Sequence, residues 1–333
     1  MYRNGWGTKV GQEIVFTSGS IAYIDATPSM PDLKIELKRK QALNTLATSV
    51  QVTATLDINF SRRSVLDEQI SIPITNYNTK TNIIFPNFNG GKATLKINAG
   101  NVDEKIFIFY IRGMNPTVAA IRAYVGRNNG PWFYNYIIQQ ESTNHQFNIG
   151  TPSPTGLAGT PNRSHDETGW GLGQIDSGSN DITRDILWNW KSNLDHGIAF
   201  INNEKKGIAV IGINRINNLI NDWDNNNPDR NINADDVVSN YDVHNYSFSH
   251  VNSSEFINTW VSEYELTGNS FMDAMWIKAY NGVSYPGNAS GQYYSVTNQS
   301  GIGLDGLPLK PLFQVNNLNN HSHDYVNSVL GHN

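Results

Sequence analysis

The spacing of apolar residues changes once along this chain, near residue 114, and that change constrains the fold more than any other feature. The clearest alternation of apolar and polar residues before it contains Val50, Val52, Ala54, Leu56, Ile58 and Phe60. A period of two places one set of side chains on the core face of a strand. Shorter runs of the same kind predict strands over 13–17, 33–37, 70–74, 82–85, 93–97 and 106–111. Short strands separated by turn residues predict an immunoglobulin-like β-sandwich over residues 1–114.

Beyond residue 114 the spacing becomes helical. Asn115 suits a helix cap, Pro116 suits a first helical turn, and apolar residues then recur at 118, 121 and 125. Further helices are predicted over 131–142, 183–203, 208–223, 254–264, 270–280 and 325–330. Two surface loops, 150–163 and 222–250, are expected between them. The second predicted domain, residues 115–333, is therefore mostly α-helical.

Charge and composition exclude several classes of protein. The chain has 333 residues, 24 Lys and Arg against 29 Asp and Glu, and no cysteine. The longest basic stretch is Lys38-Arg39-Lys40, so nucleic acid is not an expected partner. The lack of cysteine excludes disulfides and thiol chemistry. No apolar run reaches the roughly 18–20 residues of a membrane span.

No metal or organic cofactor is expected. The acidic stretch at 222–229 lacks the glycine and the glutamate of an EF-hand loop, and His321 and His323 have no evident third ligand. Chemistry must therefore come from carboxylates, histidines, hydroxyls or amides.

Glu141 is the first candidate for such chemistry. It falls in the last turn of the predicted helix 131–142, one turn after Ile137, at the edge of an apolar face. Partial burial without a nearby cation raises the pKa of a carboxyl group, as a general acid near neutral pH requires. Position alone favours the alternative, a solvated glutamate at a helix end, and the segments that follow change that balance.

Three further motifs follow Glu141-Ser142. They are Gly169-Trp170-Gly171-Leu172-Gly173-Gln174-Ile175-Asp176, then Asn193-Leu194-Asp195-His196-Gly197, then Ala279-Tyr280-Asn281-Gly282. In this order they resemble the lysozyme-like superfamily of goose-type lysozymes and soluble lytic transglycosylases, over residues 116–330. The resemblance implies a lysozyme-like α domain that cleaves the β-1,4 bond between N-acetylmuramic acid and N-acetylglucosamine of peptidoglycan glycan strands.

The same resemblance implies roles for individual residues. Glu141 corresponds to the catalytic acid of the family. The residues that correspond to its substrate-binding positions are Ser142, Gly171, Gln174, Tyr280, Asn281 and Tyr325. Two departures put the subsite preference in question: Gly173 replaces the usual methionine, and residues 222–250 look like an insertion.

A second carboxylate distinguishes two reactions. An inverting hydrolase needs one to activate water, whereas a transglycosylase uses a single glutamate first as acid and then as base. Asp176 matches the aspartate that follows the Gln-Val pair of goose-type enzymes, and Asp166, with Glu167 as its rival, matches a further acidic residue. Hydrolysis by a muramidase is therefore favoured. The alternatives are a lytic transglycosylase that releases 1,6-anhydromuramoyl products and a non-catalytic glycan-binding protein with a lysozyme fold; Asp176 itself also suits a turn.

The chain shows no apolar segment of a secretion signal at its start. A wall hydrolase made in the cytoplasm would then reach the periplasm or cell wall by another route. The expectation is an antibacterial type VI secretion effector or a phage tail lysozyme. Its β module, residues 1–114, would attach to the secretion apparatus or phage tail and be dispensable for bond cleavage. An effector would also imply an immunity protein in the cleft.

Overall fold

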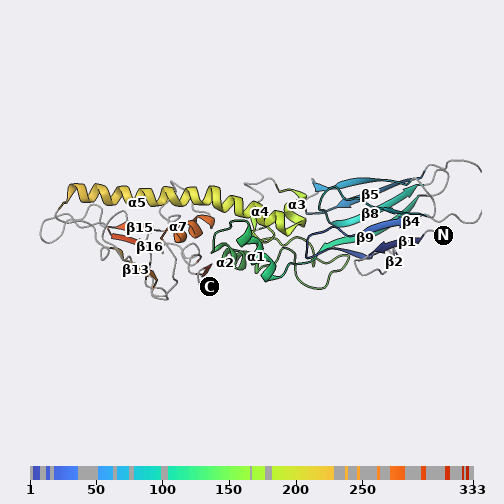
Figure 1. Ribbon diagram of the computed structural model, residues 1–333, viewed down its shortest axis with the longest axis horizontal. Helices are drawn as coiled ribbons and strands as arrows, with labels where there is room; N and C mark the ends of the chain where they lie inside the picture. Colours follow the sequence, from blue (N-terminus) through green and yellow to red (C-terminus); the bar gives the residue numbers. More distant parts are fainter. Residues whose placement is uncertain are drawn as a thin grey trace, which may run out of the picture. The chain divides into compact units, whose positions relative to one another are not determined.

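The computed structural model describes residues 3–7, 13–15, 19–36, 52–62, 66–74, 79–98, 104–165, 167–176, 182–228, 237–238, 246–247, 261–262, 271–281, 294–297, 312–315, 325 and 328–329. The chain divides into two compact units. The first comprises Met1–Tyr124 and Glu141–His196, and the second comprises Val125–Gln140 and Gly197–Asn333. Figure 1 shows the elements of both units.

The compact units divide the chain at positions other than residue 114. Residues 141–196 pack with the β-rich beginning of the chain rather than with residues 197–333. Separable domains at 1–114 and 115–333 stay a prediction.

Two sheets dominate the first unit. One has the order β3-β9-β8-β5-β6, and its only parallel pair is β3 with β9. Its strands are β3 (Ile21–Ile24), β9 (Lys105–Gly113), β8 (Gly91–Asn98), β5 (Thr53–Asn59) and β6 (Glu68–Pro73). The other sheet is antiparallel, with the order β2-β1-β4-β7. Its strands are β2 (Glu13–Val15), β1 (Arg3–Gly7), β4 (Leu33–Glu36) and β7 (Lys80–Asn82).

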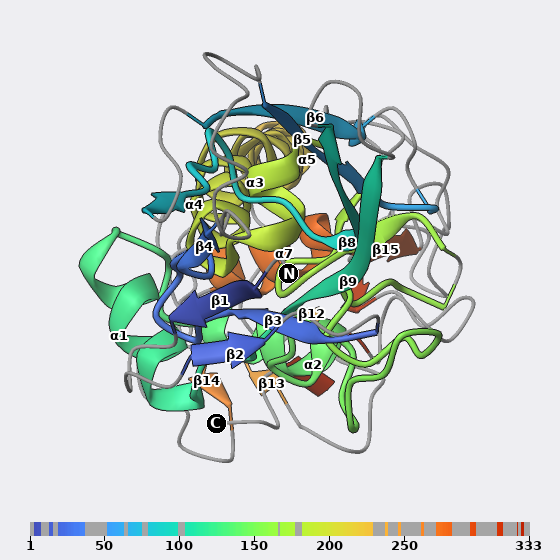
Figure 2. The same ribbon diagram turned by 90° about the vertical axis from the view of Figure 1, so that its right-hand side faces the viewer.

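The apolar side chains of both sheets enter one core. In β5 the buried residues Leu56 and Ile58 alternate with less buried polar ones, and Leu56 lies opposite Leu95 of β8. Leu33 and Ile35 of β4 belong to the same hydrophobic cluster. Figure 2 shows β5 and β6 in one layer and β1 and β2 in another. A shared core between two sheets is the arrangement of a β-sandwich; its immunoglobulin-like character stays a prediction.

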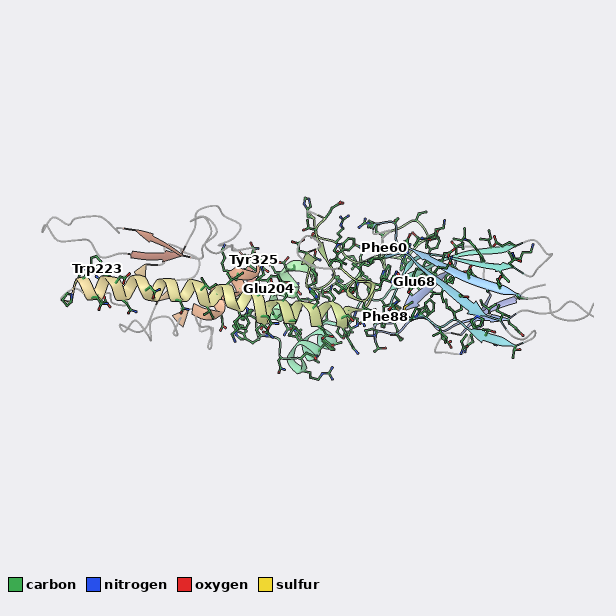
Figure 3. All side chains as sticks on the ribbon, turned by 90° about the horizontal axis from the view of Figure 1, so that it is seen from above. Phe60, Glu68, Phe88, Glu204, Trp223 and Tyr325 are labelled. Atoms are coloured by element: carbon green, nitrogen blue, oxygen red, sulfur yellow. The ribbon has the colours of Figure 1, made fainter. Side chains whose placement is uncertain are left out.

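A helical segment completes this core. Helix α3 (Arg184–Trp188) begins after Thr183, whose hydroxyl accepts a hydrogen bond from Ile186 N. Trp188 is 1% exposed and lies edge-on to Phe60, with ring centroids 5.4 Å apart. Figure 3 shows Phe60, Glu68 and Phe88 at one end of the strands. Because Phe88 N also donates to Asp185 Oδ1 of α3, the helix is held at that end of the sheets.

The start of helix α1 (Val118–Arg127) differs from the prediction. Thr117 caps the helix, since its hydroxyl accepts a hydrogen bond from Ala120 N at 3.2 Å. Asn115 instead pairs with the backbone of Phe147, to whose carbonyl it donates and from whose N–H it accepts, both at 2.8 Å. The prediction that Asn115 caps the helix is wrong because its amide is used by this tertiary contact.

The predicted loop 150–163 is only partly on the surface. Residues 158–161 are buried, and Gly113 N at the end of β9 donates to Gly159 O. The buried Arg112 donates to the carbonyls of Ser153 and Pro154. These contacts hold the loop against the sheet.

Helices dominate the second unit. Helix α4 (Trp190–Phe200), which begins in the first unit, continues into the π-helix η2 (Ile201–Lys205) and helix α5 (Lys206–Asn226). Figure 3 shows Glu204 and Trp223 along this helical run. Ile201 O accepts a hydrogen bond at 2.6 Å from Trp276 Nε1 of α7 (Phe271–Tyr280). Among the described residues, none of the helices is both long and apolar enough to cross a membrane.

The remaining strands of the structure are short. In the second unit they are β12 (Val237–Val238), β13 (Tyr246–Ser247), β14 (Val261–Ser262), β15 (Tyr294–Thr297) and β16 (Leu312–Val315). The helix predicted over 254–264 is wrong at β14, and the rest of that range lies outside the described residues. Helix α5 also extends into the loop predicted over 222–250. Residues 325, 328 and 329 are helical, as predicted.

Candidate functional site

Glu141 lies in the last turn of α2 (Tyr134–Ser142), as the sequence predicts. Its side chain is half-buried, and that of Ser142 is 4% exposed. The next two residues, Thr143 and Asn144, have φ values of 53° and 61°, which end the helix and turn the chain. The segment that follows therefore leaves the helix directly beside the candidate acid.

The glycine-rich motif forms a hairpin. Strands β10 (Gly169–Trp170) and β11 (Ile175–Asp176) pair antiparallel and are joined by the turn 171–174. Gly171 has φ +73°, and a Cβ atom added to it would lie 2.4 Å from Asn193 Nδ2 and 2.6 Å from Gln146 Oε1. Only glycine fits this position, because both the conformation and the space exclude a side chain.

Two buried amides hold the turn. Gln146 Oε1 accepts a hydrogen bond from Leu172 N at 3.1 Å, and Asn193 Oδ1 accepts one from Gly173 N at 2.9 Å. Both amide side chains are 0% exposed. Neither residue has a role in the sequence prediction, although Asn193 stands in one of the quoted motifs. A single glutamine or asparagine carries no spacing signal from which such a role can be predicted.

Backbone contacts join the same segments. Gln146 O accepts from Asn162 N at 2.8 Å, and Asn162 O accepts from Gly171 N at 2.9 Å. Residue 162 thus lies between the segment after Glu141 and the hairpin. All three segments belong to the first unit.

Gln174 turns its side chain onto its own loop. Its Nε2 donates to Gly171 O at 2.7 Å, and its backbone has φ +44°, a left-handed conformation that is costly for a residue with a side chain. Its Oε1 is buried and has no hydrogen-bond partner among the described residues. This oxygen faces Gly169 of the same hairpin, where an added Cβ atom would lie 2.8 Å from it.

The acidic candidates differ in their surroundings. Asp176 is exposed in β11, opposite Gly169. Asp166 lies outside the described residues. Its rival, Glu167, forms an ion pair with Arg163, whose Nη1 lies 3.1 Å from Glu167 Oε2. The guanidinium of Arg163 also stacks 4.9 Å from the ring centroid of Trp170. The carboxylate of Glu167 therefore already has an ion-pair partner.

The predicted site residues fall in both units. Glu141, Ser142, Gly171, Gln174 and Asp176 belong to the first unit, and Tyr280, Asn281 and Tyr325 belong to the second. Tyr280 is half-buried at the end of α7, Asn281 is exposed, and Tyr325 is buried. The ring of Tyr280 lies edge-on to that of Tyr134, with centroids 6.2 Å apart.

Lys278 is a further residue that the sequence does not predict. It is 1% exposed in α7, and its Nζ has no hydrogen-bond partner among the described residues. Burial lowers the pKa of Lys278 to about 8. In the described part of the chain, no three His, Asp or Glu side chains form a group that would hold a metal ion.

Comparison with protein-family models, curated proteins and solved structures finds no match for this chain. The resemblance to lysozyme-like enzymes therefore rests on the motifs in the sequence.

Proposed function

We propose that this protein is a peptidoglycan hydrolase, a muramidase that cleaves the β-1,4 bond between N-acetylmuramic acid and N-acetylglucosamine. The observation that supports the proposal most is the hydrogen bond from Leu172 N to Gln146 Oε1. It connects the segment that follows Glu141 to the turn that leads to Asp176. An inverting glycosidase needs two carboxyl groups in a fixed relation.

In the proposed reaction Glu141 donates a proton to the glycosidic oxygen while the bond from that oxygen to C1 of N-acetylmuramic acid breaks. Asp176 takes a proton from a water molecule, whose oxygen forms the new bond to C1. Burial disfavours the charged form of a carboxyl group, and exposure to water favours it. Glu141 is half-buried, which suits the acid, and Asp176 is exposed, so water can reach it.

The cleavage of the glycan is proposed to need no cofactor. The proposed substrate-binding residues are Ser142, Gly171, Gln174, Tyr280, Asn281 and Tyr325.

Delivery is part of the same proposal. The enzyme acts in the periplasm or cell wall, as an antibacterial secretion effector or a phage tail lysozyme. The β-rich beginning of the chain attaches to the delivery apparatus, and an immunity protein blocks the cleft in cells that make an effector.

Clearing of a peptidoglycan suspension tests the assignment of Glu141. Glu141→Gln should abolish clearing because an amide has no proton to donate to the leaving oxygen. Glu204→Gln is the matched control, since Glu204 is an exposed glutamate of η2 outside the proposed site. Equal clearing by Glu141→Gln and the wild type would refute the role of Glu141.

Mass spectrometry of the products tests the role of Asp176. Products with free reducing ends and a loss of about 10²–10⁴ in rate for Asp176→Asn are expected if Asp176 activates water. Anhydro products, lighter by one water, would instead identify a lytic transglycosylase. Binding of glycan strands without any cleavage would identify a glycan-binding protein.

A further inference from the structure

We infer that Gln146 and Asn193 are positioning residues, which fix the turn 171–174 and through it the location of Asp176 relative to the Glu141 segment. This inference rests on the proposed function, because it concerns the water-activating carboxylate of that reaction. The contacts that carry it all lie within the first unit.

The two amides connect backbone groups of helix α3 with backbone groups of the hairpin. Helix α3 is five residues long. The last carbonyl groups of a helix have no N–H group of the same helix from which to accept a hydrogen bond. Gln146 Nε2 donates to Ile186 O at 3.2 Å and to Leu187 O at 2.8 Å, and Asn193 Nδ2 donates to Ile186 O at 3.2 Å. The end of α3 is thereby satisfied by side chains.

The same two amide side chains also form hydrogen bonds with the backbone of the turn 171–174. Their oxygens accept from Leu172 N and Gly173 N, and Asn193 Nδ2 also donates to Trp170 O at 3.0 Å. A primary amide is a neutral group that can accept two hydrogen bonds and donate two at the same time. Replacement by an apolar residue leaves several buried backbone groups without partners, which is costly.

The turn is close to Asp176 in sequence, so the position of the turn restricts the position of Asp176. Only Gln174 and Ile175 intervene after Gly173, and Ile175 is 3% exposed in the core. A shift of the turn therefore moves the carboxylate of Asp176. Gln146 also belongs to the segment after Glu141, so its hydrogen bond with Leu172 N joins that segment to the turn before Asp176. Misplacement of a reacting group by about 1 Å can cost about 10²-fold in rate.

The experiment compares Gln146→Met and Asn193→Leu with wild type on soluble muropeptide oligomers. The expected result is a fall in kcat of about 10–10²-fold with little change in KM, together with a larger share of 1,6-anhydro products, because water attack depends on Asp176. Asn89→Leu is the matched control. Asn89 is a buried amide of the same unit, 1% exposed, that hydrogen-bonds to Glu68 and Gly90. Its loss should destabilise the unit without a change in product ratio.

Circular dichroism at the assay temperature establishes that each variant is folded. If either apolar variant does not fold, Asn193→Ser replaces it, because a hydroxyl keeps one donor and one acceptor. A folded variant with the kcat and product ratio of the wild type overturns the inference and leaves the proposed function intact. Absence of cleavage by the wild type overturns both.

Discussion

Removal of the Trp188 side chain should unfold the first unit at a markedly lower temperature. Trp188 is 1% exposed and contacts Phe60 and Phe147. The backbone of Gly90 lies so close that an added Cβ atom would be 2.5 Å from the indole ring. The Trp188→Ala substitution thus empties a site surrounded on several sides, where little collapse can refill it.

The cost follows from this burial. Truncation of a buried tryptophan to alanine lowers the free energy of unfolding by about 3–5 kcal/mol. In a unit of this size each kcal/mol lowers the Tm by about 2–4 °C, so a fall of about 6–20 °C is expected.

Thermal unfolding followed by near-ultraviolet circular dichroism, with urea titration for the free energy, measures the effect. The control is Tyr23→Ala, because Tyr23 is an aromatic residue of the same unit that is 43% exposed, and its loss should cost about 1 kcal/mol. If Trp188→Ala costs no more than that control, the core shared by α3 and the sheets does not stabilise the unit as argued.

Three further outcomes are expected. The sequence predicts that deletion of residues 1–114 is harmless to cleavage. The structure leads us to expect that the deletion abolishes cooperative unfolding of the remainder, because residues 147–188 share their core with the deleted strands. A folded and active truncation would contradict this. Gly171→Ala should lower the free energy of unfolding by about 2 kcal/mol, measured by urea titration, since its Cβ would overlap both buried amides. The free energy of unfolding should rise by about 3 kcal/mol between about pH 8 and pH 10.5. In that range Lys278 is protonated in the unfolded chain and neutral in the folded protein. In Lys278→Met this rise, followed by Tm against pH, should disappear.

The strands that the sequence predicts are those whose side chains alternate. β5 and β8 alternate over their full lengths because one face of each enters the core. β1 (Arg3–Gly7) has no such pattern, and its position comes from pairing with β2 and β4 on either side. Pairing between distant segments leaves no local signal, so this strand is missed.

Helix ends show the same limit. Asn115 and Thr117 both suit an N-cap by residue type. Thr117 is the cap because the side-chain amide of Asn115 is hydrogen-bonded to the backbone N–H and C=O of Phe147, which is distant in sequence. Local preference therefore predicts that a helix begins here but not which residue caps it.

The site divides in a similar way. Glu141 in the last turn of a helix is predicted from the helical spacing and agrees with α2. The turn at Gly171 is not predicted. Gln146 is not predicted, because its partners Leu172 and Ile186 lie in segments that only the folded chain brings together. Motifs identify the residues that would touch a substrate more readily than those that hold them in place.

The choice of neutral amides for this task has a chemical consequence. Gln146 and Asn193 do not titrate, so the hydrogen bonds that fix the turn persist across the pH range in which carboxyl groups change charge. By contrast, an ion pair such as that of Arg163 with Glu167 depends on the charge of both of its side chains. A turn held by such a pair would lose that contact when either charge is lost. Under the proposed function, the amides therefore keep the turn before Asp176 in one position while the pH of the cleavage assay is varied.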